Sequence, residues 1–211
     1  MPTAEARTMQ PSTLERVRIT GPAGTIEIDV NDSGRPPRAI ALIAHPHPLQ
    51  GGTKDNKVVT TLAKAFYGLG HVVLRPNFRG VGHSEGVHDE GRGETDDLVL
   101  AADYAKRRYG GGLPITLAGF SFGSFVQTRV ARRIATAQLV LIAPAVNRFA
   151  TDAVPSNTLV VHGERDDVVP LSAVLDWARP QNLPIVVVPG GEHFFHGRLA
   201  LLSRIVVAYC R

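Results

Sequence analysis

The sequence has almost no cysteine: Cys210, next to the C-terminus, is the only one among 211 residues. A single thiol excludes an internal disulfide and any metal site that needs several cysteine ligands. Long apolar runs are also missing, because none approaches the ~20 residues of a membrane-spanning helix. Residues 1–10 have no apolar core of the kind that a secretory signal contains. These absences predict a cytoplasmic protein with no membrane partner.

Positive charge is in slight excess but is not concentrated. The chain has 23 basic and 19 acidic residues, and the basic ones occur singly or in short doublets such as Arg107-Arg108 and Arg132-Arg133. Nucleic-acid-binding proteins gather such residues on one stripe or face, so we expect no nucleic-acid partner. The glycines at 110–112 lack the Lys-Ser/Thr of a phosphate loop, and no Gly-x-Gly-x-x-Gly follows the first buried strand. We therefore expect no cofactor.

Short apolar runs alternate with segments of helical spacing from residue 39 onward, which predicts an α/β fold. The expected strands are 39–44, 72–74, 115–118, 139–143, 159–162 and 185–188. The expected helices are 56–69, 94–109, 125–135, 171–178 and 196–209. Continuous apolar runs are typical of parallel strands buried on both faces. Before them, 16–20 and 25–30 flank a Gly-Pro-Ala-Gly turn and predict an antiparallel hairpin. We expect residues 1–13 to form a flexible tail and 14–211 a single domain.

A serine stands where the strand 115–118 gives way to a helix. The segment reads Gly119-Phe120-Ser121-Phe122-Gly123, and Gly-x-Ser-x-Gly between a strand and a helix is typical of a nucleophile elbow. Small residues on either side of the serine let strand and helix approach closely. The same pattern occurs around Ser84, but there it lies in a glycine- and charge-rich loop. Context therefore favours Ser121 as the nucleophile over Ser84.

Two later loops offer the base and the acid that a serine nucleophile needs. Both follow strands of the expected parallel sheet, whose carboxyl ends lie at one edge. The first contains Asp166 and Asp167, and the second contains His193, with His196 three residues further on. Position in the loop favours His193 as the base. The residues themselves leave both aspartates open as the acid.

The chain resembles the α/β-hydrolases, and within them the small lidless group near the dienelactone hydrolases and carboxylesterases. The resemblance rests on motifs in the order of that fold: His45-Pro46-His47-Pro48 with Gly51-Gly52, Asp55 to Val59, Asn77 to Ser84, Gly119 to Gly123, His162 to Pro170, and His193-Phe194-Phe195. It implies a mostly parallel central sheet with helices on both faces. Only about fifteen residues join the strands 139–143 and 159–162, a length typical of an ordinary connection, so we expect no cap domain.

The resemblance also assigns roles to individual residues. It implies that Asp166, the fifth residue of a His-Gly-x-x-Asp pattern, is the acid, which leaves Asp167 as a candidate cap for the next helix. It places one oxyanion N–H at Phe122 and the other in the 45–49 loop. Prolines at 46 and 48 have no N–H, so His47 is the expected donor and Leu49 the alternative.

These expectations combine into a serine hydrolase that cleaves a carboxylic ester or thioester of a small soluble substrate through an acyl-enzyme. A peptidase or amidase with the same triad, and a non-catalytic binding protein of the same fold, remain alternatives. Five histidines in loops show no metal-ligand spacing, so we interpret them as structural and expect no metal; they are His45, His47, His83, His88 and His162. Five phenylalanines near the elbow and base loop are interpreted first as core packing; they are Phe120, Phe122, Phe125, Phe194 and Phe195.

Overall fold

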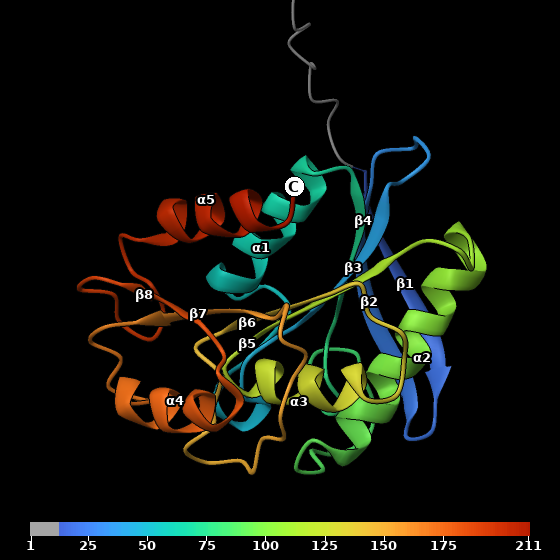
Figure 1. Ribbon diagram of the computed structural model, residues 1–211. Helices are drawn as coiled ribbons and strands as arrows, with labels where there is room; N and C mark the ends of the chain where they lie inside the picture. Colours follow the sequence, from blue (N-terminus) through green and yellow to red (C-terminus); the bar gives the residue numbers. More distant parts are fainter. Residues whose placement is uncertain (1–12) are drawn as a thin grey trace, which may run out of the picture.

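A computed structural model describes residues 13–211, in which one eight-stranded sheet runs through the centre (Figure 1). The strand order is β1-β2-β4-β3-β5-β6-β7-β8. The strands are β1 (Thr13–Gly21), β2 (Gly24–Asp32), β3 (Ala39–Ala44), β4 (His71–Pro76), β5 (Ile115–Phe120), β6 (Gln138–Ile142), β7 (Leu159–Gly163) and β8 (Ile185–Val188). Residues 1–12, which make up most of the expected tail, lie outside the described residues, and Thr13 already belongs to β1.

The sheet is mixed in the way that the sequence predicts. Strands β3 to β8 pair in parallel, whereas β1 pairs antiparallel with β2 and β2 pairs antiparallel with β4. The continuous apolar runs of β3 and β5 are buried at every position, as expected for strands covered on both faces. The predicted hairpin is confirmed, and its pairing runs along both strands to the turn at 21–24.

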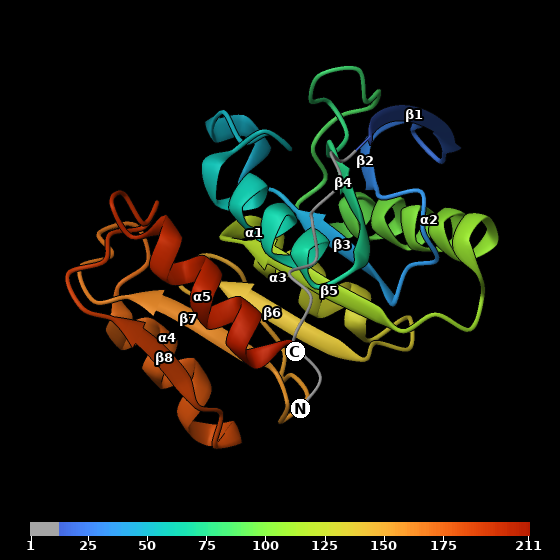
Figure 2. The ribbon, with the colours of Figure 1, turned by 90° about the horizontal axis from the view of Figure 1, so that it is seen from above.

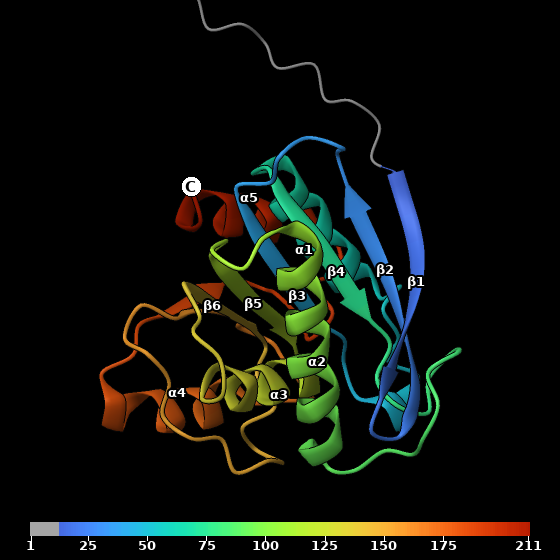
Figure 3. The ribbon, with the colours of Figure 1, turned by 90° about the vertical axis from the view of Figure 1, so that its right-hand side faces the viewer.

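Helices cover both faces of the sheet and form two cores. The helices α1 (Lys57–Gly68) and α5 (Leu199–Tyr209) lie on one face, and α2 (Arg92–Tyr109), α3 (Phe122–Ala131) and α4 (Leu171–Ala178) lie on the other (Figures 1 and 2). Two short 3₁₀ helices, η1 (Pro48–Gln50) and η2 (Arg179–Gln181), complete the elements. Figure 3 shows α2 and α3 side by side on their face of the sheet.

Two predicted helix boundaries are wrong for local backbone reasons. The elbow helix was expected at 125–135 but begins at Phe122, because the chain reverses within the single residue Ser121. It ends at Ala131, after which Arg132 and Arg133 donate i→i−3 hydrogen bonds that close the last turn. The last helix was expected from residue 196 but begins at Leu199, because Phe195 and Gly197 both have positive φ and interrupt helical backbone.

The connection from β6 to β7 is short and irregular. Within the described part of the chain, residues 143–158 contain no helix or strand. The expected absence of a cap domain is therefore confirmed, and the carboxyl ends of the central strands are not roofed by an inserted unit. Across residues 13–211, none of the helices combines the length and the apolar character that crossing a membrane requires.

Candidate active site

The elbow presents Ser121 on a strained turn between β5 and α3. Ser121 has φ 55° and ψ −117°, a conformation that costs a non-glycine residue about 1–3 kcal/mol. Two glycines make the turn possible by close approach. A Cβ on Gly119 would stand 2.4 Å from the Gly123 carbonyl oxygen, and one on Gly123 would stand 2.4 Å from that of Ala44. The absence of a Cβ atom at both positions thus lets the strand, the helix and the loop after β3 pack closely against one another.

One imidazole connects this serine to a carboxylate. The Nε2 atom of His193 is 3.1 Å from the Ser121 hydroxyl, and its Nδ1 atom is 2.7 Å from an Asp166 oxygen. All three residues are at most 8% exposed. An ionised carboxylate can only accept hydrogen bonds, so Nδ1 must donate to Asp166 and Nε2 is left to accept from the serine hydroxyl. The chain of contacts therefore fixes the tautomer that a general base needs.

The carboxylate of Asp166 is held ionised by its neighbours. Burial by itself raises the pKa of Asp166. The hydrogen bonds from His193 and from the Val169 N–H lower this pKa, and so do the electrostatic effects of the His193 and His162 rings. The lowering effects outweigh burial, so the pKa of Asp166 lies below its usual value. The second oxygen accepts the N–H groups of Val168 and Val169 at 3.0 and 2.8 Å. Every hydrogen bond to Asp166 thus favours the charged form.

Backbone contacts bring the acid loop and the base loop together. The Arg165 N–H donates to the Gly191 carbonyl at 2.8 Å, and a Cβ on Gly163 would stand 2.4 Å from the same oxygen. The Glu164 side chain accepts the Gly190 N–H at 2.7 Å. Small residues at 163 and 191 therefore let the two strand ends approach closely enough for the imidazole to reach the carboxylate.

The alternative residues are placed elsewhere. Asp167 is exposed and does not cap α4, because the residue preceding that helix is Pro170 and no side chain caps it. His196 is exposed, with Nδ1 3.4 Å from a Glu192 oxygen. Ser84 is buried in its loop, where its hydroxyl accepts the Glu27 N–H at 3.0 Å and donates to the Asn77 carbonyl at 2.8 Å. These two hydrogen bonds let the Ser84 hydroxyl brace the loop after β4.

The two expected oxyanion donors face no protein acceptor. Within residues 13–211, neither the Phe122 N–H nor the His47 N–H makes a hydrogen bond to the protein. The Phe122 N–H belongs to the first turn of α3, where N–H groups lack helical partners and the helix dipole favours negative charge. The rings of His47 and Phe122 lie 5.0 Å apart. Leu49, the alternative, lies in η1 with 75% of its surface exposed.

A cavity of about 120 Å³ opens beside the serine. Its walls include Ser121, His193, His47, Asn56 and Phe194, and no Asp or Glu of the described chain lines it. Phe194 is 43% exposed at the rim of the cavity. The other four phenylalanines near the elbow and the base loop are buried in the core; they are Phe120, Phe122, Phe125 and Phe195. The cavity thus joins an apolar rim to the polar serine and imidazole, and its size suits a small group.

A brace behind His47 was not predicted from the sequence, which gave His88 only a general structural role. The ring of His88 lies 4.8 Å from that of His47, and its Nδ1 is 2.8 Å from an oxygen of Glu94. Glu94 is fully buried and also accepts the N–H groups of Asp89 and Gly91 at 2.9 Å. An acid in the first turn of α2 was the available signal, but no local pattern links it to the loop after β3. Burial and the adjacent His88 lower the pKa of His47.

The described part of the chain contains no cluster of side chains that could bind a metal ion. Residues 13–211 contain no group of three or more His, Cys, Asp or Glu side chains that could hold a metal ion. Two buried histidines of the strand-end loops, His45 and His162, instead bond to backbone. The His45 ring accepts the Phe78 N–H at 2.9 Å and donates to the Pro46 carbonyl at 2.7 Å, and His162 lies 2.9 Å from the Val169 carbonyl.

Fold and elbow together define an α/β serine hydrolase, and comparison with known proteins gives the same class. The model of the family described as serine aminopeptidase, S33, matches residues 35–156. The chain belongs to this family of α/β hydrolases. The match contains the elbow at Ser121 and ends before Asp166 and His193.

Three relatives cover nearly all of the chain. An α/β serine hydrolase homologue from Coxiella burnetii is 42% identical, with a TM-score of 0.84, over 92% of this chain and 96% of that one. A serine hydrolase without lid from Xanthomonas campestris is 34% identical, with a TM-score of 0.88, over 96% of both chains. An uncharacterized protein of Rickettsia prowazekii is 30% identical over 219 residues, which is 93% of this chain and 88% of the relative.

Proposed function

We propose that this serine hydrolase cleaves carboxylic esters or thioesters of small soluble molecules through an acyl-enzyme. The observation that carries the proposal is the hydrogen-bonded chain from the Ser121 hydroxyl through His193 to Asp166. In this scheme Ser121 is the nucleophile, His193 the general base and Asp166 the group that orients the imidazole.

The first half-reaction follows from these contacts. His193 Nε2 takes the serine proton as the oxygen attacks the substrate carbonyl, and the negative charge moves to the carbonyl oxygen. The N–H groups of Phe122 and His47 stabilise that oxyanion, each by roughly 3–4 kcal/mol. The tetrahedral intermediate then collapses, and the leaving alcohol or thiol takes the proton from the imidazolium. The acyl group stays on Ser121.

Water completes the cycle by the same route in reverse. His193 accepts a proton from the water molecule as its oxygen attacks the acyl carbon, and the same two N–H groups hold the second oxyanion. The serine oxygen leaves with the proton that His193 returns, and the free acid is released. No electron donor or further reactant is required.

The dimensions of the cavity favour short acyl groups. The space beside Ser121 is about 120 Å³ and is bordered on its apolar side by Phe194. A short acyl chain would fill this space, whereas a long one would extend past the rim into solvent and gain little from further length. We therefore propose that activity falls as the acyl chain lengthens.

An aminopeptidase is the second candidate, because the matched family is described by that activity. Such an enzyme must hold the terminal ammonium of its substrate, and a desolvated ammonium needs a carboxylate partner. The described residues around the cavity supply none. Ester or thioester cleavage, which needs no such partner, therefore fits the cavity better than cleavage of an unblocked peptide.

The test is hydrolysis of p-nitrophenyl acetate, butyrate and decanoate, compared with aminoacyl p-nitroanilides. Ser121→Ala should abolish ester turnover and labelling by a fluorophosphonate, whereas the matched control Ser84→Ala should keep both. Undiminished turnover in Ser121→Ala would refute the assignment. Absence of labelling in the native protein would favour a non-catalytic binding protein, and faster cleavage of the anilides would favour the aminopeptidase.

A further inference from the structure

A second and larger hollow lies away from the serine. It has a volume of about 580 Å³, within the ~300–1,000 Å³ typical of small-molecule sites. It is formed by the first turns of α2, the C-terminal part of α3 and the segment 150–152, and it shares no lining residue with the cavity at Ser121. We call it the arginine hollow, after the charged residues that line it: Arg92, Arg129, Arg132, Arg133, Asp96 and Asp152.

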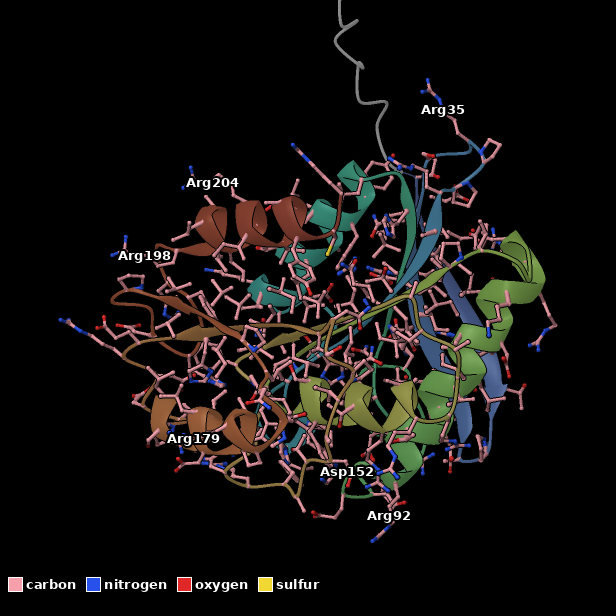
Figure 4. The ribbon with its side chains drawn as sticks, viewed as in Figure 1. Arg35, Arg92, Asp152, Arg179, Arg198 and Arg204 are labelled. Carbon is pink, nitrogen blue, oxygen red and sulfur yellow. The ribbon has the colours of Figure 1, made fainter. Side chains whose placement is uncertain are left out.

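The charged side chains come from three separate elements. Figure 4 shows the labelled Arg92 and Asp152 near one another at the lower edge, where both line the hollow, whereas Arg198 and Arg204 extend from the opposite side of the molecule. Three of the four arginines lie within residues 129–133, which include the doublet Arg132-Arg133. The fold adds Arg92, which stands 37 positions before Arg129.

Positive charge remains in excess after the internal ion pairs are counted. Arg132 pairs with Asp152, Arg133 pairs with Asp96, and Arg92 pairs at 2.9 Å with Asp89, which stands just outside the lining. Four guanidiniums therefore meet three carboxylates, which leaves one positive charge. Arg129 is half-buried and lies over the Phe125 ring at 5.7 Å, and no carboxylate within residues 13–211 pairs with it. The ring thus attracts the guanidinium itself and favours its position at the wall of the hollow.

Helix stability accounts for only part of this arrangement. Arginines near the C-terminal end of α3 are favoured by the helix dipole, which is a structural reason for Arg129, Arg132 and Arg133. The same dipole disfavours a cation in the first turn of α2, where Arg92 stands, and the ion pair of Arg92 with Asp89 offsets part of this cost. Three arginines at spacings i, i+3 and i+4 also repel one another. An anion between the two helices would reduce the part of both costs that the ion pairs leave.

We propose that the arginine hollow binds a phosphate group of a small molecule. Guanidinium presents paired N–H donors that match two phosphate oxygens, and it is weakly hydrated. The remaining positive charge favours an anion, and a phosphate group offers three acceptor oxygens to the four guanidiniums, whereas a carboxylate offers two. The volume leaves room for the organic part of such a ligand.

This site is separable from ester hydrolysis. Ser121 precedes α3 and Arg129 stands eight positions later, which at ~1.5 Å per residue places the two about 12 Å apart along the helix. Binding therefore does not depend on the proposed reaction, and the variant Ser121→Ala should bind phosphate as the native protein does.

The chain contains its own reporter of this site. Trp177, the only tryptophan, donates its indole N–H to the Thr151 carbonyl at 3.1 Å, and Thr151 lies between two residues that line the hollow. A ligand that reorders the segment 150–152 should alter the indole environment. A change in the intrinsic fluorescence of Trp177 can then show that the binding detected by calorimetry occurs at the arginine hollow.

The experiment is calorimetric titration of the full chain with inorganic pyrophosphate and with glycerol 2-phosphate at constant ionic strength, with acetate as the monoanion control. We expect saturable binding of both phosphates with a Kd of about 1 mM or below, and at least tenfold weaker acetate binding. Arg129→Gln should weaken phosphate binding by about tenfold or more. Asp152→Asn should strengthen it roughly threefold, because it removes a competing negative charge.

The matched control is Arg179→Gln, which removes an exposed arginine whose ion pair with Asp176 lies outside the hollow. Its phosphate affinity should equal that of the native protein. The proposal is overturned if phosphate shows no saturable binding up to about 10 mM, or if Arg179→Gln weakens binding as much as Arg129→Gln does. Weaker binding in Asp152→Asn, which leaves every arginine in place, overturns it even if Arg129→Gln fails to fold.

Discussion

Replacing Asp166 by asparagine tests the most specific geometric feature of the site. The asparagine carbonyl can still accept the N–H groups of Val168 and Val169, which now bind one carboxylate oxygen. Its amide nitrogen would then face His193 Nδ1, where the second oxygen now lies at 2.7 Å. That nitrogen can only donate. The imidazole would have to give up the Nδ1 proton and carry it on Nε2 instead, so it could no longer accept the Ser121 proton.

The expected loss is large because the base is present but in the wrong tautomer. The same kind of change in a serine protease triad lowers kcat by on the order of 10⁴, which corresponds to about 5 kcal/mol of activation free energy. The cost to folding should be far smaller, about 1–2 kcal/mol, since the backbone hydrogen bonds survive. We therefore expect kcat on p-nitrophenyl butyrate to collapse while thermal unfolding stays cooperative.

The neighbouring residue supplies a matched control. Asp167→Asn makes the same chemical change one position away, on an exposed side chain, and should leave kcat within about twofold of the native value because exposed substitutions are nearly neutral. A folded Asp166→Asn variant that keeps a tenth or more of native turnover would refute the reasoning. An equal loss in both variants would show that general charge, and not the hydrogen bond to His193, matters.

Three further changes probe the supports of the site. Burial lowers the pKa of His45 from 6.5 to about 4. Between these pH values the unfolded chain therefore binds one more proton than the folded chain. The free energy of unfolding should fall by about 3 kcal/mol as the pH drops through this range. His45→Gln should remove this part of the pH dependence in urea titrations at pH 7 and pH 4. Gly123→Ala should cost about 3 kcal/mol, since its Cβ would meet the Ala44 carbonyl at 2.4 Å; denaturation midpoints measure this. Ser84→Ala should cost about 1–3 kcal/mol, because two buried partners lose their hydrogen bonds, and calorimetric melting measures it.

Each of these predictions has an outcome that contradicts it. An unchanged slope of stability against pH in His45→Gln would mean that this ring is not the buried neutral group. Gly111→Ala is the control for the glycine, because nothing lies within 4 Å of its Cβ, and equal losses at 111 and 123 would remove the packing argument. If Ser84→Ala lost fluorophosphonate labelling while still folded, the nucleophile would have to be reassigned.

Much of the fold could be predicted because its local signals agree with one another. The apolar runs of the central strands are too short for membrane helices and too continuous for amphipathic ones, so they predict a buried parallel sheet. The ends of α3 and α5 could not be predicted in the same way. Residues 132–135 and 196–198 are compatible with helix, and they leave it because of positive φ at 195 and 197 and because the chain must turn back to enter β6.

The site shows the same division between local and distant information. Ser121 follows from a pattern within five residues, whereas the choice between Asp166 and Asp167 depends on which carboxylate meets an imidazole 27 positions away. The brace of His88 and Glu94 behind His47, and the arginine hollow, each combine residues from separate elements. No local spacing encodes such contacts, so they appear only when the chain is folded.

The bare connection between β6 and β7 has a kinetic consequence. In hydrolases with a mobile segment over the serine, opening and closing of that segment takes microseconds to milliseconds and often limits turnover. Residues 143–158 form no such segment. A substrate that diffuses to this chain meets the serine without waiting for a gate, so solvent viscosity should slow capture of the substrate but leave the later steps unchanged.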